Sequence, residues 1–338
     1  MSETTRIGLT DATDLLIRAF SATGLGQEQA RAVAAALVRA EAEGQVGHGF
    51  SRLADYAAQV KSGKVNEAAR PRAWHLSATQ IAVDAEHGFA FPALDLGIRE
   101  GLETAGQFGM ASVAVTNSHH CGALSVQVER IAKAGFIGLM MANTPKAIAP
   151  WGGSAPVYGT NPIAFATPRE GADPLVIDLS LSQVARGKVM HAKKSGQPIP
   201  EGWALDADGQ PTTDPEAALA GSMMPIGGAK GTALALMVEI LAAVLTSAHF
   251  SIEASSFFAA DGPPPGVGQI LLILKPNSPA SDFALRLEEL LAHVTAEQGT
   301  RLPGARRLDH LARAEAEGLD IPNNYLAVAE ELASSPTA

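Results

Sequence analysis

Apolar residues recur every three to four positions through the first sixty residues of the chain. Residues 10–22 place Leu15, Leu16 and Phe20 on one side, and the pattern stops at Gly24. Because an α-helix has 3.6 residues per turn, this spacing predicts an amphipathic helix with one buried face. Further helices are expected at 27–43 and at 50–60.

The middle of the chain alternates β-branched apolar runs with helical patterns. Residues 110–116 read as a strand, and residues 123–134 follow as a helix that Gly135 ends. Such alternation predicts an α/β fold, while helical segments dominate both ends. Other expected strands are 80–85, 136–142, 162–166, 175–179 and 269–274, and other expected helices are 91–105 and 232–245.

Two stretches show no steady hydrophobic period. Residues 190–215 are rich in Lys, Gly, Pro and Asp, and residues 261–265 contain three consecutive prolines. Both are expected to be loops, the first of them a long ordered surface loop or arm.

Composition narrows the choice of partners. The 338 residues include 35 acidic and 25 basic ones, a formal net charge of −10, and 46% are hydrophobic. This is enough to bury a core of one large or two medium domains, but no general basic field attracts nucleic acid or an anionic membrane. Neither partner is expected, and any bound anion must meet a local basic site.

The compartment expected from the sequence is the cytoplasm. Cys121 is the only cysteine, so it has no partner for an internal disulfide. Acidic residues at 3, 11 and 14 interrupt the segment where a signal peptide needs an unbroken apolar core. The apolar runs at 232–245 and 268–274 are too short to cross a bilayer, which needs about 20 apolar residues.

The common nucleotide and metal motifs are missing. Gly24-Leu25-Gly26 follows a helix and has Gln29 where a third glycine belongs, so a Rossmann fingerprint is absent, and there is no P-loop. The remaining cluster of potential metal ligands is His119-His120. Adjacent side chains on an extended backbone point to opposite faces, so these two are not expected to share a metal ion.

Polar residues gather instead in loops between apolar elements. His48 lies between two glycines, where an imidazole could act as a general acid or could simply occupy a turn. Arg52, one helical turn later and four residues before Tyr56, could hold a substrate carboxylate or could pair with Asp55 or Glu43. For His119 and His120, a structural hydrogen-bonding role and a catalytic role are both open.

Other candidates suit an anionic ligand. Lys230 follows a glycine-rich turn that leads into an expected helix, where free N–H groups favour anions. Asp178 ends an apolar strand and could contact a ribose or cap a helix. Three arginines around Pro303-Gly304 form a compact basic turn that suits a phosphate, although a solvated loop has the same composition; they are Arg301, Arg306 and Arg307.

Taken together, five ordered segments resemble the non-Rossmann malate/L-lactate dehydrogenase family, and within it the Δ1-piperideine-2-carboxylate/Δ1-pyrroline-2-carboxylate reductases. They are Gly47-His48-Gly49-Phe50-Ser51-Arg52, residues 117–122, residues 159–165, residues 225–231 and residues 301–307. The resemblance covers nearly the whole chain. It implies a non-Rossmann α/β fold that binds NADPH, with NADH possible, in a homodimer. It also implies a discontinuous substrate and dimerisation domain (1–115 with 296–338) and an NAD(P)-binding domain (116–295).

The resemblance also implies roles for individual residues. His48 matches the proton donor, with His120 as second candidate, and Arg52 and Thr160 match substrate contacts. The expected cofactor contacts are His119, His120, Cys121, Gly122, Ala123, Val176, Ile177, Asp178, Lys230, Arg301, Leu302, Pro303, Gly304, Ala305, Arg306 and Arg307. No metal site is implied.

Two positions depart from the family pattern. Gly47 stands where many members have serine, and Lys188 stands where the imine reductases can have an aspartate that tunes the histidine. The expected activity is NAD(P)H-dependent reduction of a small cyclic 2-imino acid. A dehydrogenase of an open-chain 2-hydroxy acid is the first alternative, and a non-catalytic protein that senses the cofactor is the second.

Overall fold

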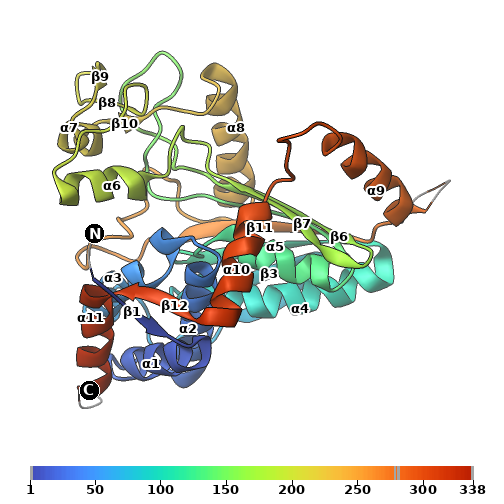
Figure 1. The fold of residues 1–338 in the computed structure, drawn as a ribbon, viewed down its shortest axis with the longest axis horizontal. Helices are drawn as coiled ribbons and strands as arrows, with labels where there is room; N and C mark the ends of the chain where they lie inside the picture. The colour runs from blue at the N-terminus through green and yellow to red at the C-terminus, as the bar shows by residue number, and fades with distance from the viewer. Residues whose placement is uncertain (1–2, 278, 280–281, 336–338) are drawn as a thin grey trace.

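The computed structural model describes residues 3–277, 279 and 282–335, and within them one seven-stranded sheet forms the centre (Figure 1). Its strand order is β2-β3-β4-β11-β5-β6-β7. Only β3 and β4 run parallel, and all other neighbours are antiparallel, so the topology is not the parallel Rossmann type. The strands are β2 (Arg72–Ser77), β3 (Gln80–Asp84), β4 (Met110–Ser118), β5 (Ile137–Ala142), β6 (Ile163–Arg169), β7 (Ala172–Leu179) and β11 (Val267–Leu274).

Strand β11 is apolar on both faces because helices pack against both. Leu271 and Ile273 join a core with α4 (Ala90–Phe108) and α5 (Leu124–Lys133). Ile270 joins a second core with α8 (Ala229–Glu239) on the other face. A strand buried on both sides reads as a continuous apolar run, and the sequence at 270–274 has this form.

The N-terminal and C-terminal segments of the chain lie side by side (Figure 1). Strand β1 (Thr4–Ile7) pairs antiparallel with β12 (Leu319–Pro322), and their neighbouring helices share one core. The helices around this pair are α1 (Leu9–Ser21), α2 (Gln27–Ala42), α3 (Leu53–Lys61), α10 (Ala305–Glu317) and α11 (Asn323–Ser334). The predicted domain boundary at 115/116 falls inside β4, and that division stays a prediction.

The expected long loop at 190–215 is wrong in part. It contains most of α6 (Arg186–Ser195), whose polar sequence has little apolar period, and two strands of a three-stranded sheet. Two-residue strands give no periodic signal, which is why the pattern missed them. That sheet is formed by β8 (Ala204–Leu205), β9 (Pro211–Thr212) and β10 (Ser222–Met223), with α7 (Pro215–Ala220) beside it.

The expected helix at 232–245 begins earlier and changes geometry. It is α8 followed by a π-helical turn, η3 (Ile240–Val244), and both expose several large apolar side chains. Further along, α9 (Phe283–Val294) projects from the side of the molecule (Figure 1). In the part of the chain that the structure describes, no helix is long and apolar enough to cross a membrane.

Candidate active site

His48 and Arg52 lie in two consecutive 3-10 turns between α2 and α3, η1 (Val46–His48) and η2 (Phe50–Arg52). The Arg52 side chain is 7% exposed, and its Nε donates to the carbonyl of Gly47 at 2.8 Å. Within the described residues, Nη1 of Arg52 is buried and has no hydrogen-bond partner. Burial lowers the pKa of Arg52, with the charges of Tyr56 and Asp55 acting against it. A buried cation with an unused donor is well suited to a carboxylate ligand.

His120 packs beside His48. The two imidazoles stack with centroids 5.5 Å apart and planes 17° apart. The Tyr56 hydroxyl forms a short hydrogen bond with Nδ1 of His120. Burial raises the pKa of Tyr56, so this hydroxyl stays protonated and we assign it as the donor. Nδ1 of His120 then accepts, and its Nε2 carries the proton of the neutral ring.

His119 belongs to the same cluster. Its Nε2 lies 2.5 Å from Oε1 of Gln59, whose amide nitrogen donates to the carbonyl of Phe257 at 2.8 Å. Both His119 and His120 make ring contacts with Tyr56 and Phe257. The two histidines follow the end of β4 and are not part of a regular strand, so both can reach the same two rings.

The environment keeps all three imidazoles neutral at neutral pH. Burial and the charge of Arg52 lower the pKa of His48 to about 3. Burial also lowers the pKa of His119 to about 3, helped by Lys64 and Arg52. The pKa of His120 is lowered well below its ordinary value, mainly by burial. A neutral imidazole can accept a proton, which is the state that a general base needs.

Glu41 lies beneath the turn that carries these residues. Its carboxylate accepts a hydrogen bond from the backbone N–H of Phe50 at 2.8 Å. A Cβ at Gly49 would lie 2.0 Å from Oε2 of Glu41, so only glycine fits above the carboxylate. Burial raises the pKa of Glu41 to about 7, although the Phe50 hydrogen bond opposes this. No motif or hydrophobic pattern selects Glu41 as a site residue.

Three of the segments predicted to bind the cofactor meet on one surface. The N–H of Ser125, in the first turn of α5, donates to Oδ2 of Asp178 at 2.7 Å, which joins the 119–123 loop to the end of β7. Gly304 has φ +79°, and a Cβ there would lie 2.8 Å from the carbonyl of Val176. The basic turn therefore packs directly against β7.

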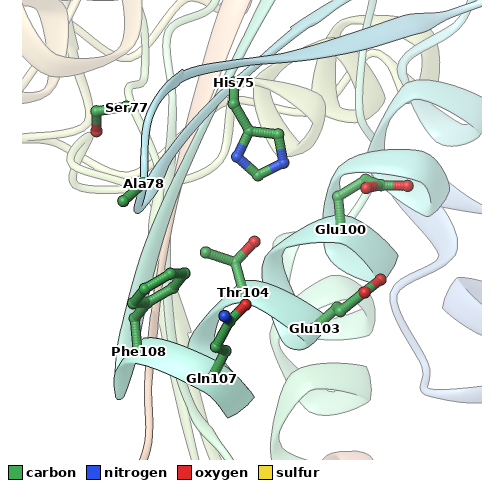
Figure 2. Close-up of a pocket in the computed structure, with 8 residues that line it drawn as sticks. All are labelled: His75, Ser77, Ala78, Glu100, Glu103, Thr104, Gln107 and Phe108. Carbon is green, nitrogen blue, oxygen red and sulfur yellow. The ribbon is translucent and has the colours of Figure 1, made fainter.

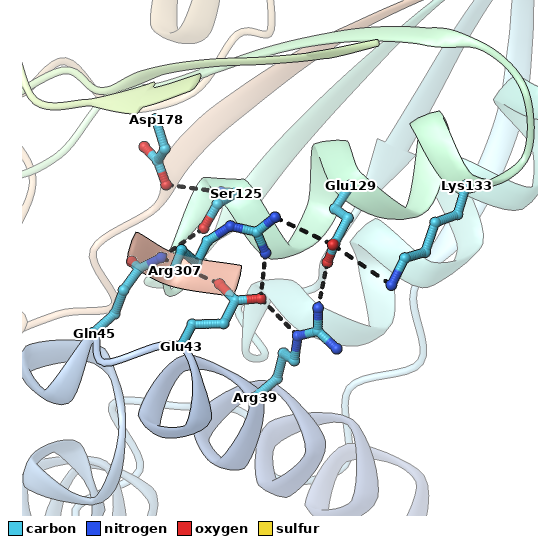
Figure 3. Close-up of polar contacts among 8 residues, drawn as sticks. All are labelled: Arg39, Glu43, Gln45, Ser125, Glu129, Lys133, Asp178 and Arg307. Atoms are coloured by element: carbon cyan, nitrogen blue, oxygen red, sulfur yellow. Dashed lines mark hydrogen bonds and ion pairs between the residues drawn. The ribbon is translucent and has the colours of Figure 1, made fainter. Parts of the chain in front are cut away.

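Arg307 lies in a buried ion network (Figure 3). It is 8% exposed, and its guanidinium contacts Glu43 at 2.6 Å and Glu129 at 3.2 Å. Arg39 contacts the same two carboxylates at 2.6 and 2.5 Å. Burial acts to raise the pKa of Glu129, but the hydrogen bond and charge of Arg307 outweigh it and lower that pKa. The network joins α2, α5 and α10. Within it, two carboxylates neutralise Arg307, the arginine that the sequence had predicted to contact a phosphate.

The remaining predicted residues lie elsewhere. Thr160 donates its N–H to Oγ1 of Thr144 at 2.9 Å, and Lys230 is exposed in the first turn of α8. Within the described residues, neither one forms a hydrogen bond or an ion pair with His48. Figure 2 shows a surface pocket of about 450 Å³ between α4 and the β2–β3 hairpin, with His75 and Glu100 among its lining residues. None of its lining residues was predicted to belong to the site.

Comparison with known proteins identifies the family of the chain. Residues 7–328 match the family described as Malate/L-lactate dehydrogenase. The chain belongs to that family. It is 50% identical, over 96% of both chains, to a "(2R)-3-sulfolactate dehydrogenase (NADP(+))" of Chromohalobacter salexigens. It is 39% identical, over 98% of both, to a Δ1-pyrroline-2-carboxylate/Δ1-piperideine-2-carboxylate reductase of Pseudomonas putida.

Solved structures of the family have the same fold. The Δ1-piperideine-2-carboxylate reductase of Pseudomonas syringae superposes with a TM-score of 0.92 at 38% identity, covering 97% of this chain and 100% of that one. A sulfolactate dehydrogenase of Methanocaldococcus jannaschii superposes with a TM-score of 0.88 at 26% identity, covering 97% and 96%. The predicted family and the α/β non-Rossmann fold are confirmed. The chain is an NAD(P)-dependent oxidoreductase, and NADPH is consistent with its relatives.

The residues of this family member fit a dinucleotide. In the first turn of α5, the N-cap residue Ala123 provides no side-chain cap and Asp178 accepts only from the N–H of Ser125, so other backbone N–H groups remain for a phosphate. Asp178 lies beside that turn with a carboxylate suited to a ribose hydroxyl. Arg301 and Arg306 are exposed on the adjoining basic turn. These groups share one surface, as a bound dinucleotide requires.

Three residues that contact the candidate site were not selected from the sequence. Tyr56 had one signal, its spacing of four from Arg52 on a helical face. Phe257 and Phe258 had none, because they come from a distant segment and the fold alone brings them to the histidines. Phe257 lies 4.9 Å from His120 between ring centroids, and the Phe258 ring lies 4.4 Å from the Arg52 guanidinium carbon.

Proposed function

We propose that the protein interconverts a small 2-oxo acid and its 2-hydroxy acid with NADPH and NADP⁺. We propose further that the substrate carries a second anionic group, as 3-sulfolactate does. The observation that carries the proposal is the buried Nη1 of Arg52, an unused donor beside two stacked neutral imidazoles. The 50% identity to a sulfolactate dehydrogenase supports the choice of substrate class.

Arg52 binds the carboxylate of the substrate and thereby changes the state of His48. The charge of Arg52 contributes to the low pKa of His48. A bound carboxylate neutralises that charge, so it raises the pKa of His48 toward a range useful for proton transfer. Substrate binding therefore raises the pKa of His48, the residue that we propose accepts and returns the proton.

His48 and His120 have different tasks. In the oxidation direction, neutral His48 accepts the proton of the C2 hydroxyl, and in reduction the imidazolium returns it. His120, whose Nδ1 is engaged by Tyr56, donates from Nε2–H to the C2 oxygen and stabilises the charge that develops there. When bound, the nicotinamide supplies or accepts the hydride at C2. The loop 119–123, Asp178, Arg301 and Arg306 hold the dinucleotide.

Lys188 is the proposed contact for the second anion. It is exposed in the first turn of α6. The resemblance to the family implies that it stands where the imine reductases can have an aspartate. A lysine attracts a sulfonate or a second carboxylate, whereas an aspartate repels it. Reduction of a cyclic 2-imino acid is the second candidate, since it needs the same carboxylate contact and the TM-score of 0.92 to a piperideine-2-carboxylate reductase favours it.

Replacement of Lys188 tests the substrate class. In Lys188→Asp, the KM for 3-sulfopyruvate should rise at least tenfold, while the KM for pyruvate should change little, because pyruvate lacks the second anion. Lys193→Asp, on the same helix and paired with Glu216 at 3.1 Å, is the control. Equal changes for the two substrates would remove Lys188 from this role. Binding of NADPH without turnover of either substrate or of a cyclic 2-imino acid would instead favour a cofactor sensor.

The proposal includes a homodimer. Helix α8 and η3 expose apolar side chains in succession, including Ile240 (48%), Val244 (54%) and Leu245 (59%). Monomers rarely expose a contiguous apolar patch of this kind, and a second copy of the chain is the occupant we propose. Light scattering should give a dimer for the wild type and a monomer for Ile240→Asp with Val244→Asp. A monomeric wild type would contradict the proposal.

A further inference from the structure

Residues 255–261, between η3 and β11, are fastened to the end of α3 through their backbone carbonyls. Nζ of Lys64 donates to the carbonyls of Ser256 (2.7 Å), Ala259 (2.9 Å) and Asp261 (3.0 Å). Gln59 donates to the carbonyl of Phe257 at 2.8 Å, and Ser62 donates to that of Ala260 at 2.7 Å. Five of the seven carbonyls of the 255–261 segment therefore accept a hydrogen bond from a side chain near or just beyond the C-terminal end of α3.

Lys64 is the main anchor of this segment. It is 2% exposed, although an ammonium is costly to bury unless its protons are bonded. Each of its three protons has an oxygen acceptor, which fills the donor capacity of the group. Burial lowers the pKa of Lys64, and the charge of Asp261 acts against this. A lysine in this position fixes the shape of the segment, because the carbonyls must converge on one atom.

The anchored segment carries two aromatic rings into the catalytic cluster. Phe257 is 6% exposed and packs against His119 and His120, with centroids 5.4 and 4.9 Å apart. Phe258 lies over the guanidinium of Arg52 at 4.4 Å. A ring at this distance attracts the cation and restricts its movement. It also occupies space next to the group that receives the carboxylate.

We propose that Phe258 is a specificity-determining residue of the active site and that Lys64 is a positioning residue that holds it there. Phe258 orients the Arg52 fork toward the carboxylate and limits the bulk of the substrate beside it. Lys64 acts through the backbone of the 255–261 segment and touches no reacting atom. The inference rests on the proposed contact between Arg52 and the substrate carboxylate.

Two variants of Phe258 separate its two effects. Phe258→Leu keeps apolar volume and removes the ring, so the KM for a short 2-oxo acid should rise about tenfold with kcat little changed. Phe258→Ala should show the same rise and should also increase kcat/KM for phenylpyruvate relative to pyruvate by about tenfold. Unchanged KM values in both variants would overturn the role of Phe258.

Lys64→Met tests the anchor, with Lys61→Met on the exposed face of α3 as the control. The KM for the 2-oxo acid should rise about tenfold while the Kd for NADPH stays within twofold of the wild type. Chymotrypsin, which cuts after aromatic residues, should cleave at Phe257 or Phe258 in Lys64→Met faster than in the wild type and in the control.

The outcomes of this experiment are distinct. Equal losses in cofactor and substrate binding would show a general structural anchor and would overturn the proposal, as would an unchanged KM. Because cleavage is measured without substrate, it also reports on the anchor if Lys64→Met has low activity. A wild type that turns over no 2-oxo or 2-imino acid would refute the proposed function, whereas the chymotrypsin result would still decide whether Lys64 holds the segment.

Discussion

The imidazoles of His48 and His120 stack with centroids 5.5 Å apart, but only His120 is bonded to Tyr56. The two histidines therefore differ in which ring nitrogen is free to donate or accept a proton. His120 has its Nδ1 occupied and can only donate from Nε2 while neutral, whereas neutral His48 can accept a proton. The pair therefore combines a base and a hydrogen-bond donor at one place.

Replacement of His48 should lower kcat far more than it weakens the binding of NADPH. In His48→Ala, kcat should fall by about 10² to 10⁴-fold, because a positioned acid or base typically contributes that much, while the Kd for NADPH stays near the wild-type value. His75→Ala, at the pocket of Figure 2, is the control and should leave kcat unchanged. Steady-state kinetics and fluorescence titration measure the two quantities. Near wild-type turnover in His48→Ala would transfer the role to His120.

Replacement of Arg52 should affect substrate binding. In Arg52→Lys, the KM for the carboxylate substrate should rise about tenfold to hundredfold, because an ammonium lacks the planar fork that binds a carboxylate through two bonds. The comparison is the KM of each protein at saturating NADPH, with the Kd for NADPH as an internal control. A change confined to cofactor affinity would show that Arg52 has been assigned to the wrong ligand.

Glu41 should make stability depend on pH. Burial raises the pKa of this carboxyl to about 7 from 4.5, so between pH 4.5 and 7 the folded state binds more protons than the unfolded state. The free energy of unfolding therefore falls as pH rises through that range, by about 3 kcal/mol for this group at pH 8.

Glu41→Gln removes this loss while keeping an oxygen that accepts from Phe50. At pH 8 the variant should be more stable than the wild type, and the difference should vanish near pH 4.5. Urea denaturation at both pH values measures it, and Glu28→Gln, exposed in the first turn of α2, is the control. Equal stabilities of the Glu41→Gln variant and the wild type at pH 8 would show that the carboxylate is not destabilising there.

Two arginines of the basic turn should contribute to cofactor binding, and the third should contribute to stability. Arg301→Ala and Arg306→Ala should weaken NADPH more than NADH, because an extra phosphate needs its own basic contact. Arg307→Ala should instead lower the free energy of unfolding by about 1.5–3 kcal/mol, since it removes one of the two arginines that pair with Glu43 and Glu129 and leaves Arg39 to pair with both. Arg313→Ala, exposed on the same helix, is the control. A preference for NADPH that survives in both Arg301→Ala and Arg306→Ala would place the specificity element elsewhere.

The sequence predicted those parts of the fold whose hydrophobic period is long and regular. The strand at 110–116 and its following helix agree with β4 and α5 to within two residues. The order of strands in the sheet and the β1–β12 pairing were not predictable, because they depend on contacts between residues far apart in the chain. The helix and strands within 190–215 were missed for another reason, because they are short or lack an apolar face.

The candidate site was likewise predictable only where its residues belong to a local motif. Motif reasoning selected His48, Arg52 and His120 in advance, and the structure brings them together with Tyr56. It could not foresee that two carboxylates neutralise Arg307, because Glu43 and Glu129 look like ordinary helical surface residues in the sequence. The contact of Phe258 with Arg52 could not be predicted either, because the fold of the 255–261 segment brings the two residues together.

The most direct test is the ratio of kcat/KM for 3-sulfopyruvate to that for Δ1-piperideine-2-carboxylate, measured on the wild type with NADPH. The substrate class argued from Arg52 and Lys188 predicts a ratio of at least about 100, equal to a preference near 3 kcal/mol in the transition state. The same assay with NADH shows whether the ratio depends on the cofactor. A ratio below one would contradict the account and identify a cyclic imine as the substrate.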